Sequence, residues 1–204
     1  PNKRAALFLN EHLARMADKP LWSPAYITIS DLFRSHSQRQ VADPIQVVCE
    51  LHQCFTECTG IDETRDHFYG WGQLLLSDFD DLDKNMASAE HVFANLRDIH
   101  EYDDTSYLSE EQRTILRQFF SNFSEEHNSE LKRRFLQLWS HIFDIYQSFN
   151  GKLLAQGLAY EGALYREVAE CEETDFEYDT YLFICFNMLQ QVEQTLFRRM
   201  KKEG

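Results

Sequence analysis

The stretch Phe68–Lys84 constrains this chain more than any other part of its sequence. Apolar residues recur there every three or four positions, which is the spacing of one face of an α-helix. Leu74 and Leu76 widen this face on either side. Other elements must cover so broad an apolar face, so we expect this helix to lie at the centre of the fold. The residues of the face are Phe68, Trp71, Leu75, Phe79, Leu82 and Met86.

The same helix carries four aspartates near its end, Asp78, Asp80, Asp81 and Asp83. Asp80 and Asp81 are predicted to point away from the apolar face, whereas Asp78 and Asp83 flank it. A carboxylate that is buried without a partner is costly. We therefore expect Asp78 or Asp83 to bond a helix end, a hydroxyl group or an arginine.

From about residue 43 to residue 171 the patterns are helical throughout. Pro44 suits the first turn of a helix that ends near Gly60. A later helix has a narrow packing seam, and whether it stops at Gly151 or runs on to Gly157 is left open. The apolar positions of the helix that begins at Pro44, which we expect to be buried, are Ile45, Val48, Leu51 and Phe55. The seam of the later helix consists of Leu131, Phe135, Leu138, Ile142, Ile145 and Phe149.

Two short segments near the ends of the chain have the composition of strands. Tyr26–Ile29 is rich in β-branched residues and precedes a short helix that Ser30 or Asp31 would cap. Tyr181–Phe186 is the second candidate. The sequence thus predicts a mainly α fold: a large helical insertion (41–178) with a small partial α/β layer formed by the N- and C-terminal segments (1–40 and 179–204).

The charge of the chain is strongly negative but uneven. The net charge is −14, which argues against a free-standing nucleic-acid binder with a basic face. Residues 1–40 nevertheless carry six Lys or Arg against three Asp or Glu, so the other 164 residues hold a net charge of −17. A mildly basic start joined to an acidic body predicts two surfaces with different roles.

The five cysteines form no CxxC pair, and no apolar run reaches the roughly 18 residues of a membrane-spanning helix. We expect a cytoplasmic protein with reduced thiols and no membrane contact. The aspartate cluster lacks the Gly and Glu of a calcium-binding loop, and the motifs of zinc, di-iron, serine-hydrolase and phosphate-binding sites are absent. The sequence therefore predicts no catalytic residue, no metal and no cofactor in this chain.

Four segments resemble motifs of superfamily 1A DNA helicases of the UvrD/Rep kind, and they follow one another along the chain in the order found in that family. Asp78–Leu82 (DFDDL) looks like their acidic helix, and Pro1–Ala6 is similar to their TNKAA motif. Ile27–Phe33 is similar to their TFHSF motif, and Leu182–Met200 has the outline of the Walker B strand and the helix after it. The greatest similarity is to the AddB-like subunit of bacterial helicase–nuclease complexes. The resemblance implies part of a RecA-like domain with its helical insertion.

The resemblance also implies a degenerate ATPase site, since Cys185 and Phe186 stand where an active helicase has an Asp-Glu pair, and neither can hold magnesium or act as a base. The implied function is a non-catalytic scaffold that contacts single-stranded DNA and a helicase–nuclease partner subunit. The candidate DNA contacts are Asn2, Lys3, Arg4, Thr28 and Ser30. The alternative is an acidic helical protein–protein interaction module with no nucleic-acid role.

Overall fold

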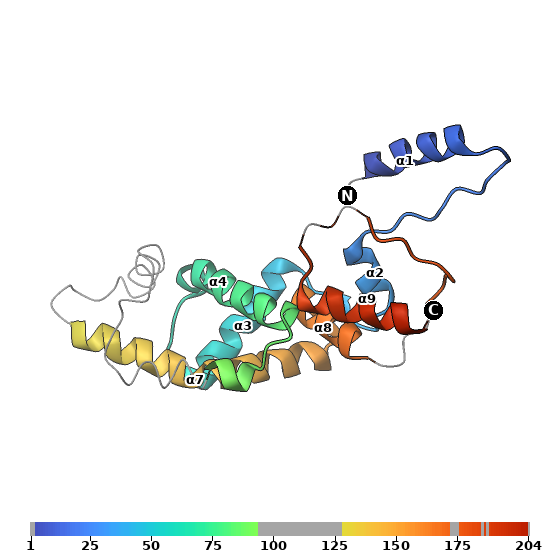
Figure 1. Ribbon diagram of the computed structural model, residues 1–204. Helices are drawn as coiled ribbons and strands as arrows, with labels where there is room; N and C mark the ends of the chain where they lie inside the picture. The colour runs from blue at the N-terminus through green and yellow to red at the C-terminus, as the bar shows by residue number, and fades with distance from the viewer. Residues whose placement is uncertain (1–2, 94–127, 172–175, 185, 187, 204) are drawn as a thin grey trace.

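A computed structural model describes residues 3–93, 128–171, 176–184, 186 and 188–203 (Figure 1). Side chains are described from Arg4 onward and, in the long helix that starts at residue 128, from Leu138 onward. The described chain is mainly helical, which confirms the predicted fold class. Its long elements are α1 (Lys3–Met16), α2 (Ile29–Ser35), α3 (Pro44–Thr59), α4 (Arg65–Lys84), α7 (Asn128–Ala155), α8 (Glu161–Glu170) and α9 (Gln191–Glu203).

The core lies between α3, α4 and α7, with α8 against α4 and α9 against α8 (Figure 1). The central position predicted for the Phe68–Lys84 stretch is confirmed, because α4 contacts α3, α8 and α9 and reaches α7 through its rings. Phe79 lies 5.1 Å, ring to ring, from Tyr146 of α7, and Phe68 lies 5.1 Å from Phe55 of α3. Four residues of the predicted apolar face are buried: Phe68, Leu75, Phe79 and Leu82.

Helix α3 begins and ends where its sequence predicts. The Asp43 side chain accepts hydrogen bonds from the backbone N–H groups of Ile45 and Gln46, at 2.9 and 3.2 Å. At the other end Gly60 takes a left-handed conformation with φ 68°, which glycine adopts without strain. The prediction that Ile45 is buried is wrong, since 63% of this residue is exposed and Val47 faces the core instead.

Helix α7 continues through Gly151 and ends at Ala155, which settles the alternative that the sequence left open. Its seam is buried at Leu138, Ile142, Ile145 and Phe149, while the side chains of Leu131 and Phe135 lie outside the described residues. Gly157, at φ 69°, turns the chain into β2 (Leu158–Ala159). This strand pairs in parallel with β1 (Gln40–Val41), Gln40 opposite Leu158 and Val41 opposite Ala159.

Both predicted strands are wrong. Residues 26–28 are irregular, and Ile29 already belongs to α2; the described residues of 181–186 are irregular too. A strand needs a neighbour for its backbone groups, and in the described part of the chain the only pairing is that of β1 with β2. Thr28 has extended backbone (φ −82°, ψ 160°) but serves as the N-cap of α2, a role expected of Ser30 or Asp31.

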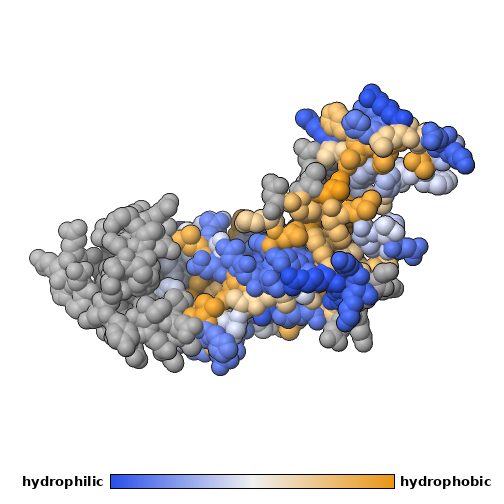
Figure 2. All heavy atoms as spheres, viewed as in Figure 1, coloured by the Kyte–Doolittle hydropathy of each residue, from blue (hydrophilic) through white to orange (hydrophobic). Residues whose placement is uncertain are grey.

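Helix α1 and the segment after it project from the rest of the described chain (Figure 1). We call residues 3–27 the arm. Its large apolar side chains face solvent, with Leu7 69% and Trp22 99% exposed. Orange atoms continue from the arm onto the adjoining body in Figure 2. Within the arm, Ser23 and Tyr26 donate hydrogen bonds to the side chain of Asn10, at 3.0 and 2.8 Å.

Candidate functional site

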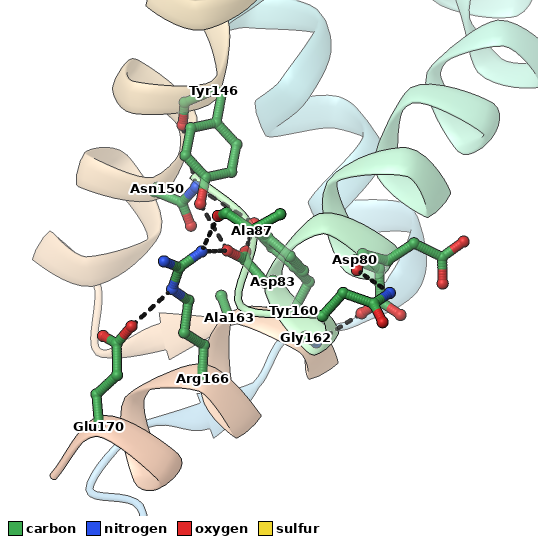
Figure 3. Close-up of polar contacts among 12 residues, drawn as sticks. Asp80, Asp83, Ala87, Tyr146, Asn150, Tyr160, Gly162, Ala163, Arg166 and Glu170 are labelled. Carbon is green, nitrogen blue, oxygen red and sulfur yellow. Dashed lines mark hydrogen bonds and ion pairs between the residues drawn. The ribbon is translucent and has the colours of Figure 1, made fainter. Parts of the chain in front are cut away.

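The acidic helix α4 contributes to a polar cluster with residues of α7 and α8 (Figure 3). Asp83 is only 1% exposed, so its carboxylate needs partners. Tyr146 of α7 donates a hydrogen bond to it at 2.6 Å, and Tyr160, just before α8, donates to its other oxygen. Arg166 of α8 forms an ion pair with it at 3.2 Å. The prediction that a flanking carboxylate bonds a hydroxyl group or an arginine is confirmed for Asp83.

Arg166 extends this cluster to the end of α4. Its guanidinium donates to the backbone oxygen of Ala87 at 2.8 Å and to Glu170 at 2.9 Å. Ala87 follows Met86, which holds a left-handed conformation with φ 52°, uncommon for a residue with a side chain. One arginine on α8 therefore holds both the last turn of α4 and the sharp bend after it.

Asp80 contacts the beginning of α8. The backbone N–H of Gly162, in the first turn of α8, donates to its carboxylate at 2.5 Å. Such an N–H has no partner within its own helix, and a negative charge is favourable there. Lys84 lies between the same two helices, 2.7 Å from Asp80 and 2.8 Å from Glu161. Asp80 was predicted to point away from the apolar face of α4, and its carboxylate contacts α8.

Burial raises the pKa of both Tyr146 and Tyr160, followed by the hydrogen bond to Asp83 in the case of Tyr146 and by the charge of Asp83 in the case of Tyr160. Both phenols thus stay protonated and act as donors to a charged carboxylate. Desolvation lowers the pKa of Lys84, but its bonds to Asp80 and Glu161 outweigh this and raise it overall. In this cluster each donor has an acceptor, and these contacts join α4 to α7 and α8.

Asp78 and Asp81 differ from the other two aspartates, because both are exposed and line a pocket beside α4. In the described chain neither carboxylate forms a hydrogen bond or an ion pair with a side chain. Desolvation and the charge of Asp81 raise the pKa of Asp78. Of the two flanking residues, only Asp83 therefore meets the predicted partners.

The predicted DNA-contacting residues are spread over two places. Asn2 and the side chain of Lys3 lie outside the described residues, and Arg4 is exposed in the first turn of α1. The Thr28 hydroxyl accepts from the backbone N–H of Asp31 at 3.1 Å and donates to the Asp31 carboxylate at 2.7 Å. Ser30 lies near Tyr165 of α8, where burial raises the pKa of that phenol and the Ser30 hydroxyl group lowers it by a smaller amount. Thr28 and Ser30 thus share the N-terminus of α2, whereas Arg4 belongs to the arm.

Of the predicted degenerate Walker B pair, Cys185 lies outside the described residues and Phe186 packs on α9. The Phe186 ring lies 6.1 Å, centroid to centroid, from that of Phe197, and Phe183 lies 3.7 Å from the same ring. This segment is thus held by aromatic contacts with the helix that follows it.

Sequence reasoning missed the partners that complete the cluster. Tyr146, Tyr160 and Arg166 lie 63 to 83 residues from Asp83. Each stands in a helical pattern that gives no sign of a distant carboxylate. The one available signal was Gly162 at the start of a helix, where a missing Cβ permits close approach of another backbone.

Within the described ranges, no three His, Cys, Asp or Glu side chains come close enough together to hold a metal ion. No described helix has the length and apolar character needed to cross a bilayer. Comparison of the chain with protein-family profiles, curated proteins and solved structures gave no match.

Proposed function

We propose that this chain is a non-catalytic scaffold within a helicase-like DNA-repair protein of the AddB-like kind, with a degenerate ATPase site, and that the start of α1 contacts single-stranded DNA. The observation that carries the scaffold part is the use of the acidic helix. Asp80 and Asp83, both within the DFDDL-like segment or next to it, join α4 to α7 and α8. Their carboxylates hold helices together and are not directed at a ligand.

The exposed apolar surface also supports a piece that works inside a larger assembly. The arm and the irregular segment around Phe183 and Ile184 expose large apolar side chains, which soluble proteins seldom leave in one contiguous patch. Such a surface suits burial against further layers of a helicase-like protein or against a partner subunit. It is equally the observation that favours the second candidate function, a protein–protein interaction module without a nucleic-acid role.

The DNA part of the proposal rests on charge. Lys3 and Arg4 begin α1 in residues 1–40, a region with more Lys and Arg than Asp and Glu. Contacts to phosphates need no sequence reading, only donors placed along the strand. The Thr28 hydroxyl group already bonds Asp31 as the cap of α2, so Lys3 and Arg4 carry the larger share of this contact.

The test is binding of a fluorescent oligothymidylate to the whole chain, followed by fluorescence anisotropy at increasing salt. We expect Lys3→Ala with Arg4→Ala to weaken binding and to reduce the slope of log K against log salt concentration by about 1.4, the value for two phosphate contacts on a single strand. The matched control is Lys201→Ala with Lys202→Ala, two exposed residues in the last turn of α9. Equal losses in the two double variants would contradict a contact at α1, and no binding by the unaltered chain would favour the interaction module.

A further inference from the structure

A pocket of about 350 Å³ lies beside α4, on the side where α7 passes. Its wall is apolar and partly aromatic. This volume is at the small end of the range of ~300–1,000 Å³ found for ligand pockets, enough for one or two large side chains. The wall includes Leu75, Phe79, Val92, Phe93, Trp139 and Ile142.

One edge of the pocket is negatively charged. Asp78 and Asp81 both line it, and Asn85 stands beside them. Desolvation, and then the negative charge of Asp81, raise the pKa of Asp78.

Two cations of α4 and α8 are already engaged elsewhere. Lys84 pairs with Asp80 and Glu161, and Arg166 pairs with Asp83 and Glu170. A ligand that places its own positive charge at Asp78 and Asp81 would therefore gain a charge-assisted contact that the described chain does not provide. The chain's net charge of −14 also favours the approach of a cationic partner.

We propose that this pocket binds a short segment of a partner protein in which a large apolar side chain stands next to a lysine or an arginine. The apolar side chain enters between Val92 and Trp139, and the cation lies at Asp78 and Asp81. This is the mode in which an exposed groove takes an anchor residue from a peptide. The proposal is independent of any DNA contact at α1, because it uses the opposite charge on a different element.

The test uses two capped tetrapeptides, Lys-Leu-Phe-Arg and Glu-Leu-Phe-Glu, titrated into the ¹⁵N-labelled whole chain. The indole N–H signal of Trp139 reports on the pocket. We expect saturable shifts of that signal with the basic peptide and none with the acidic one. Equal shifts with both peptides, or none with either, would overturn the proposal.

Three variants locate the contact. Asp78→Asn with Asp81→Asn should weaken binding of the basic peptide about fivefold, the sum expected of two exposed ion pairs. Asp62→Asn with Asp66→Asn removes the same charge from exposed positions before and at the start of α4, and should leave binding unchanged. Val92→Phe fills the pocket from a half-exposed position and should abolish binding. Binding that survives Val92→Phe, or falls equally in both double variants, refutes the assignment.

Discussion

At the scale of single residues, Asp83 shows how a carboxylate becomes structural. It sits almost fully buried in α4 and meets two neutral phenols and one guanidinium from later in the chain. A buried ion pair adds little net stability compared with an apolar replacement of the whole group, but the loss of one member leaves the others unpaired. Asp81, two residues earlier, is exposed, so water can solvate its carboxylate.

Asp83→Ala should lower the free energy of unfolding by about 3 kcal/mol, because it leaves the buried phenol of Tyr160 and the half-buried phenol of Tyr146 without their acceptor and Arg166 without one of its partners. Asp81→Ala on the same helix should change that free energy by no more than about 0.5 kcal/mol. Urea unfolding followed by circular dichroism measures both. A similar small change in both variants would show that the cluster is not needed to hold α4 to α7 and α8.

The two phenols also predict how stability depends on pH. The pKa of Tyr146 and Tyr160 is raised in the folded protein by burial and by Asp83. Their contribution to stability is fully present below about pH 10, the ordinary tyrosine pKa. Above it the unfolded chain loses protons that the folded chain keeps, so stability should fall by up to about 1.4 kcal/mol per pH unit for each tyrosine.

Urea unfolding at several pH values between about 8 and 11.5 checks this alkaline loss. Tyr146→Phe removes one of the titrating groups, so its stability should fall less steeply with pH even though it starts lower. A free energy of unfolding that stays constant through this range would mean that the phenols ionise as readily in the folded chain as in the unfolded one.

At the scale of elements, the contact of α4 with α8 depends on a glycine. A Cβ built on Gly162 would lie 2.5 Å from the backbone oxygen of Asp80 and 2.9 Å from its Cα. Backbone atoms cannot move aside as a flexible side chain can. The small residue thus lets the start of α8 come close enough for its N–H to reach Asp80.

Gly162→Ala should therefore destabilise the protein by about 1–3 kcal/mol through overpacking at this contact. Gly151→Ala is the matched control near the end of α7, where a Cβ meets nothing within 4 Å. There the change should stabilise the helix by about 0.5–1 kcal/mol, since alanine has the higher helix propensity. Thermal or urea unfolding of the pair gives opposite signs if the close approach is real, and equal signs contradict it.

At the scale of the whole molecule, the chain divides into a packed helical body and an arm whose apolar side chains remain outside. The body buries the aromatic rings of α3, α4 and α7 against one another. The arm instead exposes Leu7, Phe8 and Met16 along α1. A surface of this kind favours association with another apolar surface.

Replacement of Leu7, Phe8 and Met16 by Gln should change the free energy of unfolding by no more than about 0.5 kcal/mol per site. It should also reduce association of the chain at high concentration, as measured by sedimentation velocity. Leu153→Gln, at a position 1% exposed in α7, provides the contrast and should cost several kcal/mol. A comparable loss for the triple variant would mean that the arm packs against the body in solution.

The sequence by itself determined the mainly helical class, the limits of α3 and the buried face of α4. These features follow from the spacing of apolar residues and from capping residues, which act over one or two helical turns. Thr28 shows the limit of such reasoning, because a β-branched run with no strand to pair with became the cap of a helix. The prediction for Ile45 was wrong for a related reason, since the spacing of apolar residues does not show which side of a helix a neighbouring helix covers.

Only the tertiary structure decided which carboxylates have partners. Asp78 and Asp83 both flank the same apolar face, yet Asp83 meets two phenols and a guanidinium while Asp78 lies at the edge of a pocket. The parallel pairing of Gln40–Val41 with Leu158–Ala159 was equally beyond the local pattern. The physical reason is the same in both cases. Contacts between residues far apart in sequence depend on the angles and distances at which helices pack. The spacing of apolar residues along one helix does not determine these.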